Sequence, residues 1–259
     1  MTTQQKFDQH GRCIPNGLHS AANELSRRYF LCDQPEIDYD EIYDRVASIL
    51  SVQDGFTVEE FKTRAQKIIA ELQSDVTTEN ITKGICIPFF VPVNPDLGDI
   101  GAAIENQYLP GVGRAYAQKL PEYQFTNQHK EKLDGSLTII EGSRHERFID
   151  ALKTRTVVGV FCPCMTEYSI PASVEKIAQL PEKFLLTGGI DLCAVFIAAP
   201  DLLIKVNNYP PTIWFSALAT SGESAGLHFE AYGYNLNLYR RAHLNHAAEY
   251  WWNGVTVLG

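Results

Sequence analysis

The stretch Thr156-Val-Val-Gly-Val-Phe161 is nearly all apolar and rich in β-branched residues. An apolar run without polar alternation is typical of a strand that a sheet buries on both faces. Around it, short strand patterns at 137–140 and 183–186 alternate with helical patterns at 143–153 and 172–180. This alternation predicts a mixed α/β fold in which a partly parallel central sheet carries flanking helices.

The sequence before this region predicts helices. The last of three helical patterns opens on Thr57-Val-Glu-Glu60, which is a capping box. In such a box the Thr57 hydroxyl accepts from the Glu60 amide, and the Glu60 carboxylate reaches back to the Thr57 amide. Apolar residues then recur at helical spacing, which predicts one buried stripe. The three patterns cover residues 16–29, 39–50 and 57–73.

A polar linker at 75–82 separates these helices from the rest of the chain. After it, Pro88 and Pro92 interrupt an apolar run. Because proline cannot donate to a sheet ladder, they restrict this run to an edge strand or an extended segment. We therefore expect a helical N-terminal segment, residues 16–75, packed on a mixed α/β domain, residues 83–259.

The C-terminal part of the chain predicts antiparallel, aromatic-rich strands. Strand-like stretches cover 212–219 and 227–238, and the loop at 220–224 is placed to join them as a hairpin. Residues 239–248 favour a short helix. Asn253-Gly254 lies between β-forming residues, and this dipeptide is typical of a tight hairpin turn.

The composition is that of an ordinary globular protein, and its charge argues against some partners. Of 259 residues, 45% are hydrophobic and 20% are charged, and the formal net charge is −9. Such a charge repels phosphate backbones, so we expect no nucleic-acid partner. The apolar runs are too short for a membrane span, and the first residues lack the apolar core of a signal peptide. We expect a soluble cytoplasmic protein whose six cysteines are reduced thiols.

The first candidate site follows from the expected sheet. In α/β proteins, ligands bind outside the carboxyl ends of parallel strands. Cys162-Pro-Cys164 follows the strand at 156–161, His145 follows the strand at 137–140, and Asp191 follows the strand at 183–186. If these strands are parallel neighbours, Cys162 or Cys164 is a candidate nucleophile, because a nearby base such as His145 can draw off its proton.

Other groups near the same strand ends complete this hypothesis. Arg144 could supply a positive charge to a thiolate, and the amides of Gly188 and Gly189, at the start of a helix, could hold an anion. A simpler interpretation is that these loops are polar because they face water. Cys162-Pro-Cys164 is then a buried turn with inert thiols.

The second candidate is a metal site near the C-terminus. His228 and Glu230 lie two residues apart on an expected strand, so they share one face. His243 and His246 lie three apart, which on a helix also puts them on one face. Two histidines and a carboxylate suit a divalent metal such as Fe, Mn or Zn. The alternative interpretation leaves these side chains as ordinary surface groups.

Common motifs do not decide between these alternatives. The chain has no phosphate-binding loop, nucleophile elbow, metalloprotease helix or pair of Cys-x-x-Cys knuckles. One hypothesis is an enzyme that acts on a small molecule by thiol or metal chemistry. The other is a non-catalytic binding or assembly protein, whose contact surfaces are the N-terminal helices and the aromatic C-terminal region. Either hypothesis is compatible with a homo-oligomer.

Overall fold

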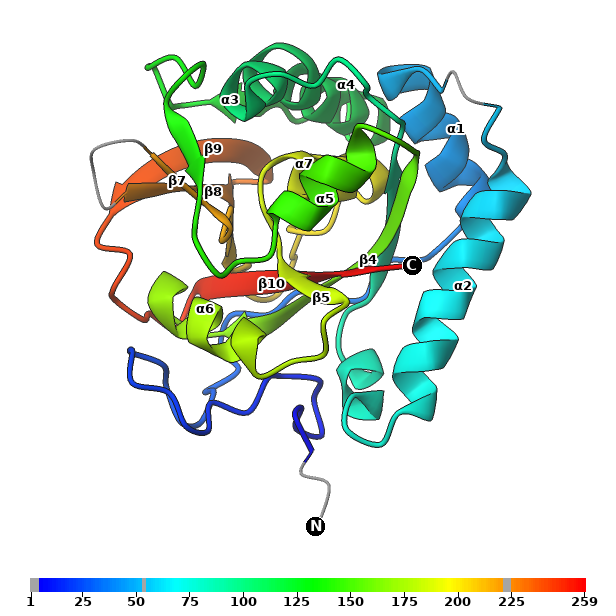
Figure 1. Ribbon diagram of the computed structural model, residues 1–259. Helices are drawn as coiled ribbons and strands as arrows, with labels where there is room; N and C mark the ends of the chain where they lie inside the picture. The colour runs from blue at the N-terminus through cyan, green and yellow to red at the C-terminus, as the bar shows by residue number, and fades with distance from the viewer. Residues whose placement is uncertain (1–4, 53–54, 221–224) are drawn as a thin grey trace.

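The computed structural model describes residues 5–52, 55–220 and 225–259. The fold is mixed α/β, as predicted, and its main sheet has the strand order β1-β4-β10-β6-β8-β9-β2, with β5 also pairing β10 (Figure 1). The strands are β1 (Ile87–Val91), β2 (Phe125–Asn127), β3 (Leu137–Ile139), β4 (Val157–Thr166), β5 (Phe184–Leu186), β6 (Thr212–Trp214), β7 (Leu218–Thr220), β8 (Ala225–Tyr232), β9 (Asn235–Ala242) and β10 (Trp251–Leu258).

The sheet is mostly antiparallel, and this decides where chemistry can sit. β4 pairs antiparallel with β1 on one side and with β10 on the other. The parallel pairings are β10 with β6 and β2 with β9. β3 lies outside the main sheet, in a separate antiparallel pair with β7. The strands after which we expected reactive loops are therefore not parallel neighbours.

β4 extends beyond the predicted stretch and is buried along its whole length. It therefore contains Cys162-Pro163-Cys164, which we had placed in the loop after the strand. The β4–β10 register shifts between Asn253 and Val255, so Pro163 and Cys164 form a bulge on β4 opposite Gly254. Bulges are among the few places in a sheet where proline is found.

Gly254 also explains why Asn253-Gly254 makes no hairpin turn. A Cβ atom on Gly254 would lie 2.2 Å from the Phe161 ring, so the glycine is needed for close approach within the sheet. The turn that does form joins β8 to β9 at Gly233 and Tyr234, which both have positive φ. The predicted loop at 220–224 falls largely on residues 221–224, which lie outside the described residues.

A buried helix forms the centre of the core. The helices are α1 (Tyr39–Leu50), α2 (Val58–Ser74), α3 (Ile100–Ala103), α4 (Leu109–Lys119), α5 (Glu146–Leu152), α6 (Ile170–Ala178) and α7 (Ile190–Ala198), with a 3-10 turn at Glu79–Lys83 and a π turn at Ile104–Tyr108. Every residue of α7 is buried, and α1, α4 and β1 pack around it. None of the described helices has the length and apolarity to cross a membrane.

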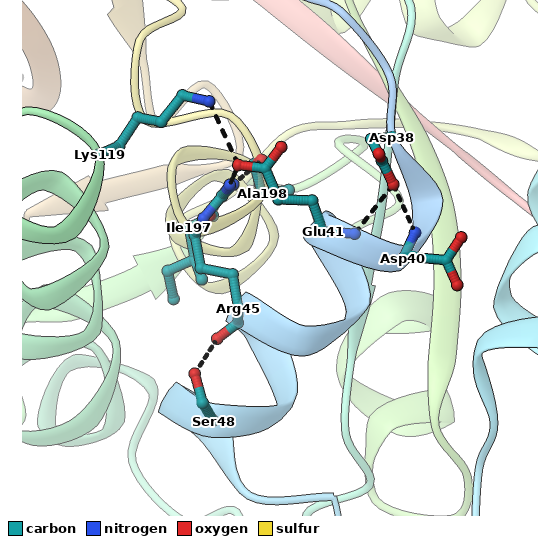
Figure 2. Close-up of polar contacts among 8 residues, drawn as sticks. All are labelled: Asp38, Asp40, Glu41, Arg45, Ser48, Lys119, Ile197 and Ala198. Carbon is teal, nitrogen blue, oxygen red and sulfur yellow. Dashed lines mark hydrogen bonds and ion pairs between the residues drawn. The ribbon is translucent and has the colours of Figure 1, made fainter.

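α1 and α2 confirm two of the three predicted N-terminal helices. Asp38 caps α1, and Arg45 on the same helix donates to the carbonyl of Ala198, 2.6 Å away, at the end of α7 (Figure 2). Glu41 pairs with both Arg45 and Lys119 of α4. The predicted capping box is present at the start of α2. Because the buried residues of α1 and α2 belong to the same core cluster as the sheet, these helices pack on the main domain. The division of the chain into a segment at 16–75 and a domain at 83–259 stays a prediction.

The predicted helix at 16–29 is wrong. Residues 5–38, which we call the N-terminal arm, are irregular and run beneath α6 and the sheet (Figure 1). Two carboxylates of the main domain bind backbone amides of the arm. Glu175 accepts from the amides of His19 and Ser20, and Glu167 accepts from the amide of Arg27. Tertiary contacts of this kind override a weak helical propensity.

Candidate functional site

The structure places the predicted catalytic residues on opposite faces of the sheet. Thr256 of β10 lies opposite Phe161 of β4, and its hydroxyl donates to Asp191, 2.7 Å away. Successive side chains of a strand point to opposite faces, so Cys162 points away from Asp191. The predicted grouping of Cys162 and Cys164 with His145 and Asp191 is therefore wrong, because it assumed loops at one edge of a parallel sheet.

His145 and Asp191 do come together, but inside the core. His145 Nδ1 lies 4.0 Å from Asp191 Oδ2, and both side chains are fully buried. Asp191 Oδ1 accepts from the amides of Gly188 and Leu192, each at 2.9 Å. The His145 ring stacks on Phe148. With no exposed surface, this pair has no route to a substrate, and its role is to hold the start of α7.

Burial raises the pKa of the Asp191 carboxyl above its ordinary value. The folded state therefore binds this proton more tightly than the unfolded state does. The stability that this bound proton contributes is fully present at pH values below the ordinary pKa of an aspartate. It is lost as pH rises through the raised pKa of Asp191 in the folded protein. We expect the wild type to lose stability relative to Asp191→Asn as pH rises from about 4. Urea unfolding of both proteins at a series of pH values measures the two free energies of unfolding. A difference between them that stays constant with pH would contradict the prediction.

The glycines predicted to hold an anion instead allow close packing. Asp191 already occupies the Gly188 amide. A Cβ atom on Gly188 would lie 2.3 Å from His145 Nε2, and one on Gly189 would lie 2.3 Å from a methyl carbon of Ile104. Arg144 donates to three main-chain carbonyls and not to a thiol. These groups therefore form no anion site.

The other face of β4 carries a cluster of four thiols, which we call the thiol cluster: Cys13, Cys86, Cys162 and Cys164. The Sγ atoms of Cys86 and Cys162 are 3.5 Å apart, and those of Cys13 and Cys164 are 3.9 Å apart. All are free cysteines. The hydrogen bond with Cys86 and burial raise the pKa of Cys162, and burial raises the pKa of Cys164. Both therefore stay protonated at neutral pH, unlike an activated nucleophile.

Cys13 and Cys86 were missed as site residues by sequence reasoning. The spacing of Cys162 and Cys164 does signal one shared face, because strand side chains repeat every two residues. Their partners come from the N-terminal arm and from the residue before β1, many positions away. No local pattern links such distant positions.

A cleft opens between the N-terminal arm and the end of β4. This arm cleft has a volume of about 740 Å³. Cys164 of β4 and Trp252 of β10 are among its lining residues. Arg28 and Lys83 are exposed in its lining, and neither side chain forms an ion pair within the part of the chain that the structure describes. The lining of the cleft therefore combines a cysteine, a tryptophan and exposed positive charge.

Two buried ionic side chains fix the arm over this cleft. Arg12 is 6% exposed and donates to the carbonyls of Asn23, Glu24 and Thr166. Glu167 is 2% exposed, and its carboxylate accepts from Asn23 Nδ2 and Ser26 Oγ, each at 2.6 Å. Because these bonds join the arm to the end of β4, they set the width of the cleft.

The predicted metal ligands are only partly gathered. His228 Nε2 lies 3.3 Å from Glu230 Oε2, so the shared strand face is confirmed. Burial lowers the pKa of His228, whose ring stacks on Trp214. His243 and His246 lie in an exposed turn after β9, with their rings 5.2 Å apart, so the predicted helix at 239–248 is wrong.

Among the described residues there is no group of three or more His, Cys, Asp or Glu side chains that could hold a metal ion. The metal hypothesis therefore has no support from the geometry. The physical reason is that β9 continues to Ala242, which leaves His243 and His246 on a turn of their own.

The aromatic C-terminal region mostly fills the interior. Trp214 and Trp251 pack together with ring centroids 4.5 Å apart, in a small cluster beside the main core. Trp252 belongs to the main core, because adjacent side chains of a strand point to opposite faces. The large aromatic side chains that remain exposed are Tyr29, Tyr209 and Tyr232.

Comparison of the chain with protein-family models, with curated proteins and with solved structures finds no match.

Proposed function

We propose that the chain binds a small molecule in the arm cleft, and that the ligand carries an anionic group and a flat apolar part. The observation that carries this proposal is the lining of the cleft, which includes the exposed Arg28 and Lys83 together with the largely buried Cys164 and Trp252. Ligand sites are commonly concave, largely apolar and equipped with a few polar groups that fix orientation.

Three carboxylates, Asp8, Glu24 and Asp33, line the cleft together with the exposed Arg28 and Lys83. Asp33 pairs with Lys205, and Asp8 accepts from the backbone amides of His10 and Arg12. These two carboxylates are thus already engaged. Arg28 and Lys83 can turn toward an incoming carboxylate, sulfonate or phosphate, and such charge-assisted hydrogen bonds are the stronger kind.

Within this proposal, Cys164 is the thiol that the ligand meets. It is 5% exposed and lies in the cleft wall, whereas Cys162 is covered. A thiol-dependent reaction, which is one of the hypotheses that the sequence leaves open, would therefore act through Cys164. Because burial raises the pKa of Cys164, a bound ligand must change the surroundings of the sulfur before a thiolate forms.

The dye anilinonaphthalene sulfonate tests the binding site, since it combines flat rings with an anion. We expect saturable binding that weakens as salt is added, because exposed charges are screened. Replacing both Arg28 and Lys83 with alanine should weaken binding by at least about tenfold, which corresponds to the loss of one charge-assisted hydrogen bond. Dye fluorescence and quenching of tryptophan emission measure it.

Lys119→Ala is the matched control, because Lys119 lies beside α1 in a separate surface hollow. It removes one positive charge from the same chain and should leave dye affinity unchanged. Equal weakening by Lys119→Ala and by the Arg28 and Lys83 substitutions would sink the proposal, as would dye binding that Trp252→Phe leaves untouched in both affinity and quenching.

One observation favours assembly as a second candidate function. Tyr29 and Tyr209 stack with ring centroids 6.0 Å apart and are 56% and 64% exposed. Val206 and Tyr232 are also exposed around a neighbouring hollow. Exposed apolar groups gathered in one region are typical of contact surfaces. Sedimentation of the wild type and of Tyr209→Ser tests this alternative. Assembly requires that the wild type sediments as an oligomer and that the substitution weakens the oligomer.

A further inference from the structure

The sheet register places Cys86 directly opposite Cys162. Ile87 pairs with Phe161 in the antiparallel β1–β4 ladder, so the next positions outward are Cys86 and Cys162. Their Sγ atoms are 3.5 Å apart. The two thiols therefore meet because of backbone pairing, and not through a chance side-chain rotation.

The backbone bonds of Cys86 define the kind of pair. Its amide donates to Gln34 Oε1 at 2.7 Å, and its carbonyl accepts from Gln34 Nε2 at 3.1 Å. Both groups therefore point away from β4, as in a non-hydrogen-bonded cross-strand pair. The Cα atoms of such pairs are about 4.5 Å apart. Disulfides span Cα separations of about 4.4–6.8 Å, so side-chain rotation alone can join the two sulfurs.

We propose that Cys86 and Cys162 form a reversible disulfide, in which Cys86 is the thiol that meets a small-molecule disulfide oxidant. Cys86 is partly exposed and follows Ile85, which lines the arm cleft. Cys162 is 1% exposed, so an oxidant cannot reach it first. The exposed member begins the reaction and the buried member completes it.

The chemistry is an ordinary thiol–disulfide exchange in two steps. The Cys86 thiolate attacks one sulfur of the oxidant, forms a mixed disulfide and releases one thiolate, which takes up a proton. Cys162 loses its proton and attacks the Cys86 sulfur, so the second oxidant sulfur leaves as a thiolate and is protonated. Two cysteine thiols are oxidised, and one oxidant disulfide is reduced to two thiols.

The second pair of the thiol cluster provides an internal comparison. Cys13 is fully buried and Cys164 is 5% exposed, with their Sγ atoms 3.9 Å apart. Both side chains are buried, whereas Cys86 is partly exposed. While the arm stays folded, we therefore expect Cys13 and Cys164 to remain thiols under conditions that oxidise Cys86 and Cys162.

Oxidised glutathione is the probe for the experiment, applied to the folded wild-type chain. After acid quenching, alkylation and digestion, mass spectrometry should find the Cys86 and Cys162 peptides joined and lighter by two hydrogen atoms. Dithiothreitol should restore both thiols. Cys162→Ser should stop at a mixed disulfide of Cys86 with glutathione, and Cys86→Ser should leave Cys162 a thiol. Cys193→Ala, inside α7, should oxidise like the wild type.

Three results would each overturn the proposal: both thiols still alkylated in oxidised wild type, joining of Cys13 to Cys164 first, or a wild-type mixed disulfide at Cys86 that is never resolved. Circular dichroism before and after oxidation checks that the measured protein is folded. The proposal needs no ligand in the arm cleft, so dye binding and disulfide formation can fail separately.

Discussion

Asp191→Ala is expected to lower the free energy of unfolding by about 3–5 kcal/mol, because it leaves buried donors without an acceptor. The carboxylate accepts from the amides of Gly188 and Leu192 and from the Thr256 hydroxyl. All of these donors are inside the core, where water cannot replace the lost bonds. The substitution also removes the acidic neighbour of His145 and leaves a cavity at the start of α7.

Asp191→Asn is the matched control for this prediction. Its amide oxygen can still accept from the two backbone amides, and its nitrogen can donate to Thr256 or His145. We therefore expect a change within about 1 kcal/mol at neutral pH. Urea unfolding monitored by far-ultraviolet circular dichroism measures both variants. If alanine and asparagine cost the same, the hydrogen bonds to Asp191 do not hold this part of the core.

Local signals in the sequence predicted the helices whose caps lie within a few residues. The capping box of Thr57 and Glu60 and the cap at Asp38 depend only on neighbouring residues, so α1 and α2 are found where their patterns lie. Pro88 likewise marks β1, which is the end strand of the sheet. These features follow from short-range geometry that this fold keeps.

The candidate site depended on strand pairing, which the local pattern does not encode. The apolar run at Thr156 predicts a buried strand, but it does not say whether the neighbours are parallel. Because successive side chains of β4 alternate between faces, Cys162 points away from the face on which Asp191 and His145 lie. Cys13 joins Cys164 only because the arm crosses β4, through a contact more than a hundred residues apart in sequence.

The arm itself shows how buried polar groups replace local propensity. Its path is set by Arg12, Glu167 and Glu175, which bind its backbone from positions outside any helical repeat. Hydrophobic periodicity carries no information about such bonds. The cleft that the arm encloses was for the same reason absent from our prediction, although Cys164, one of its lining residues, was named.

Arg12→Met is expected to release the N-terminal arm from the end of β4. Methionine keeps much of the apolar stem but removes every donor, so the carbonyls of Asn23, Glu24 and Thr166 lose their partner. Hydrogen bonds from a charged group contribute about 1.5–3 kcal/mol each. The bonds of one guanidinium are not independent, so we expect the free energy of unfolding to fall by about 2–4 kcal/mol. Chymotrypsin cleavage at exposed Leu25 or Tyr29 should accelerate by at least about tenfold.

Arg28→Met separates this anchoring role from the charge of the cleft. Arg28 is an exposed arginine of the same arm, and its substitution should change the free energy of unfolding by less than about 0.5 kcal/mol. It should weaken dye binding without exposing the arm to protease, whereas Arg12→Met should do both. Were Arg12→Met to leave the arm as resistant as the wild type, Glu167 and Glu175 would hold it without the guanidinium. The buried guanidinium would then have no part in forming the cleft.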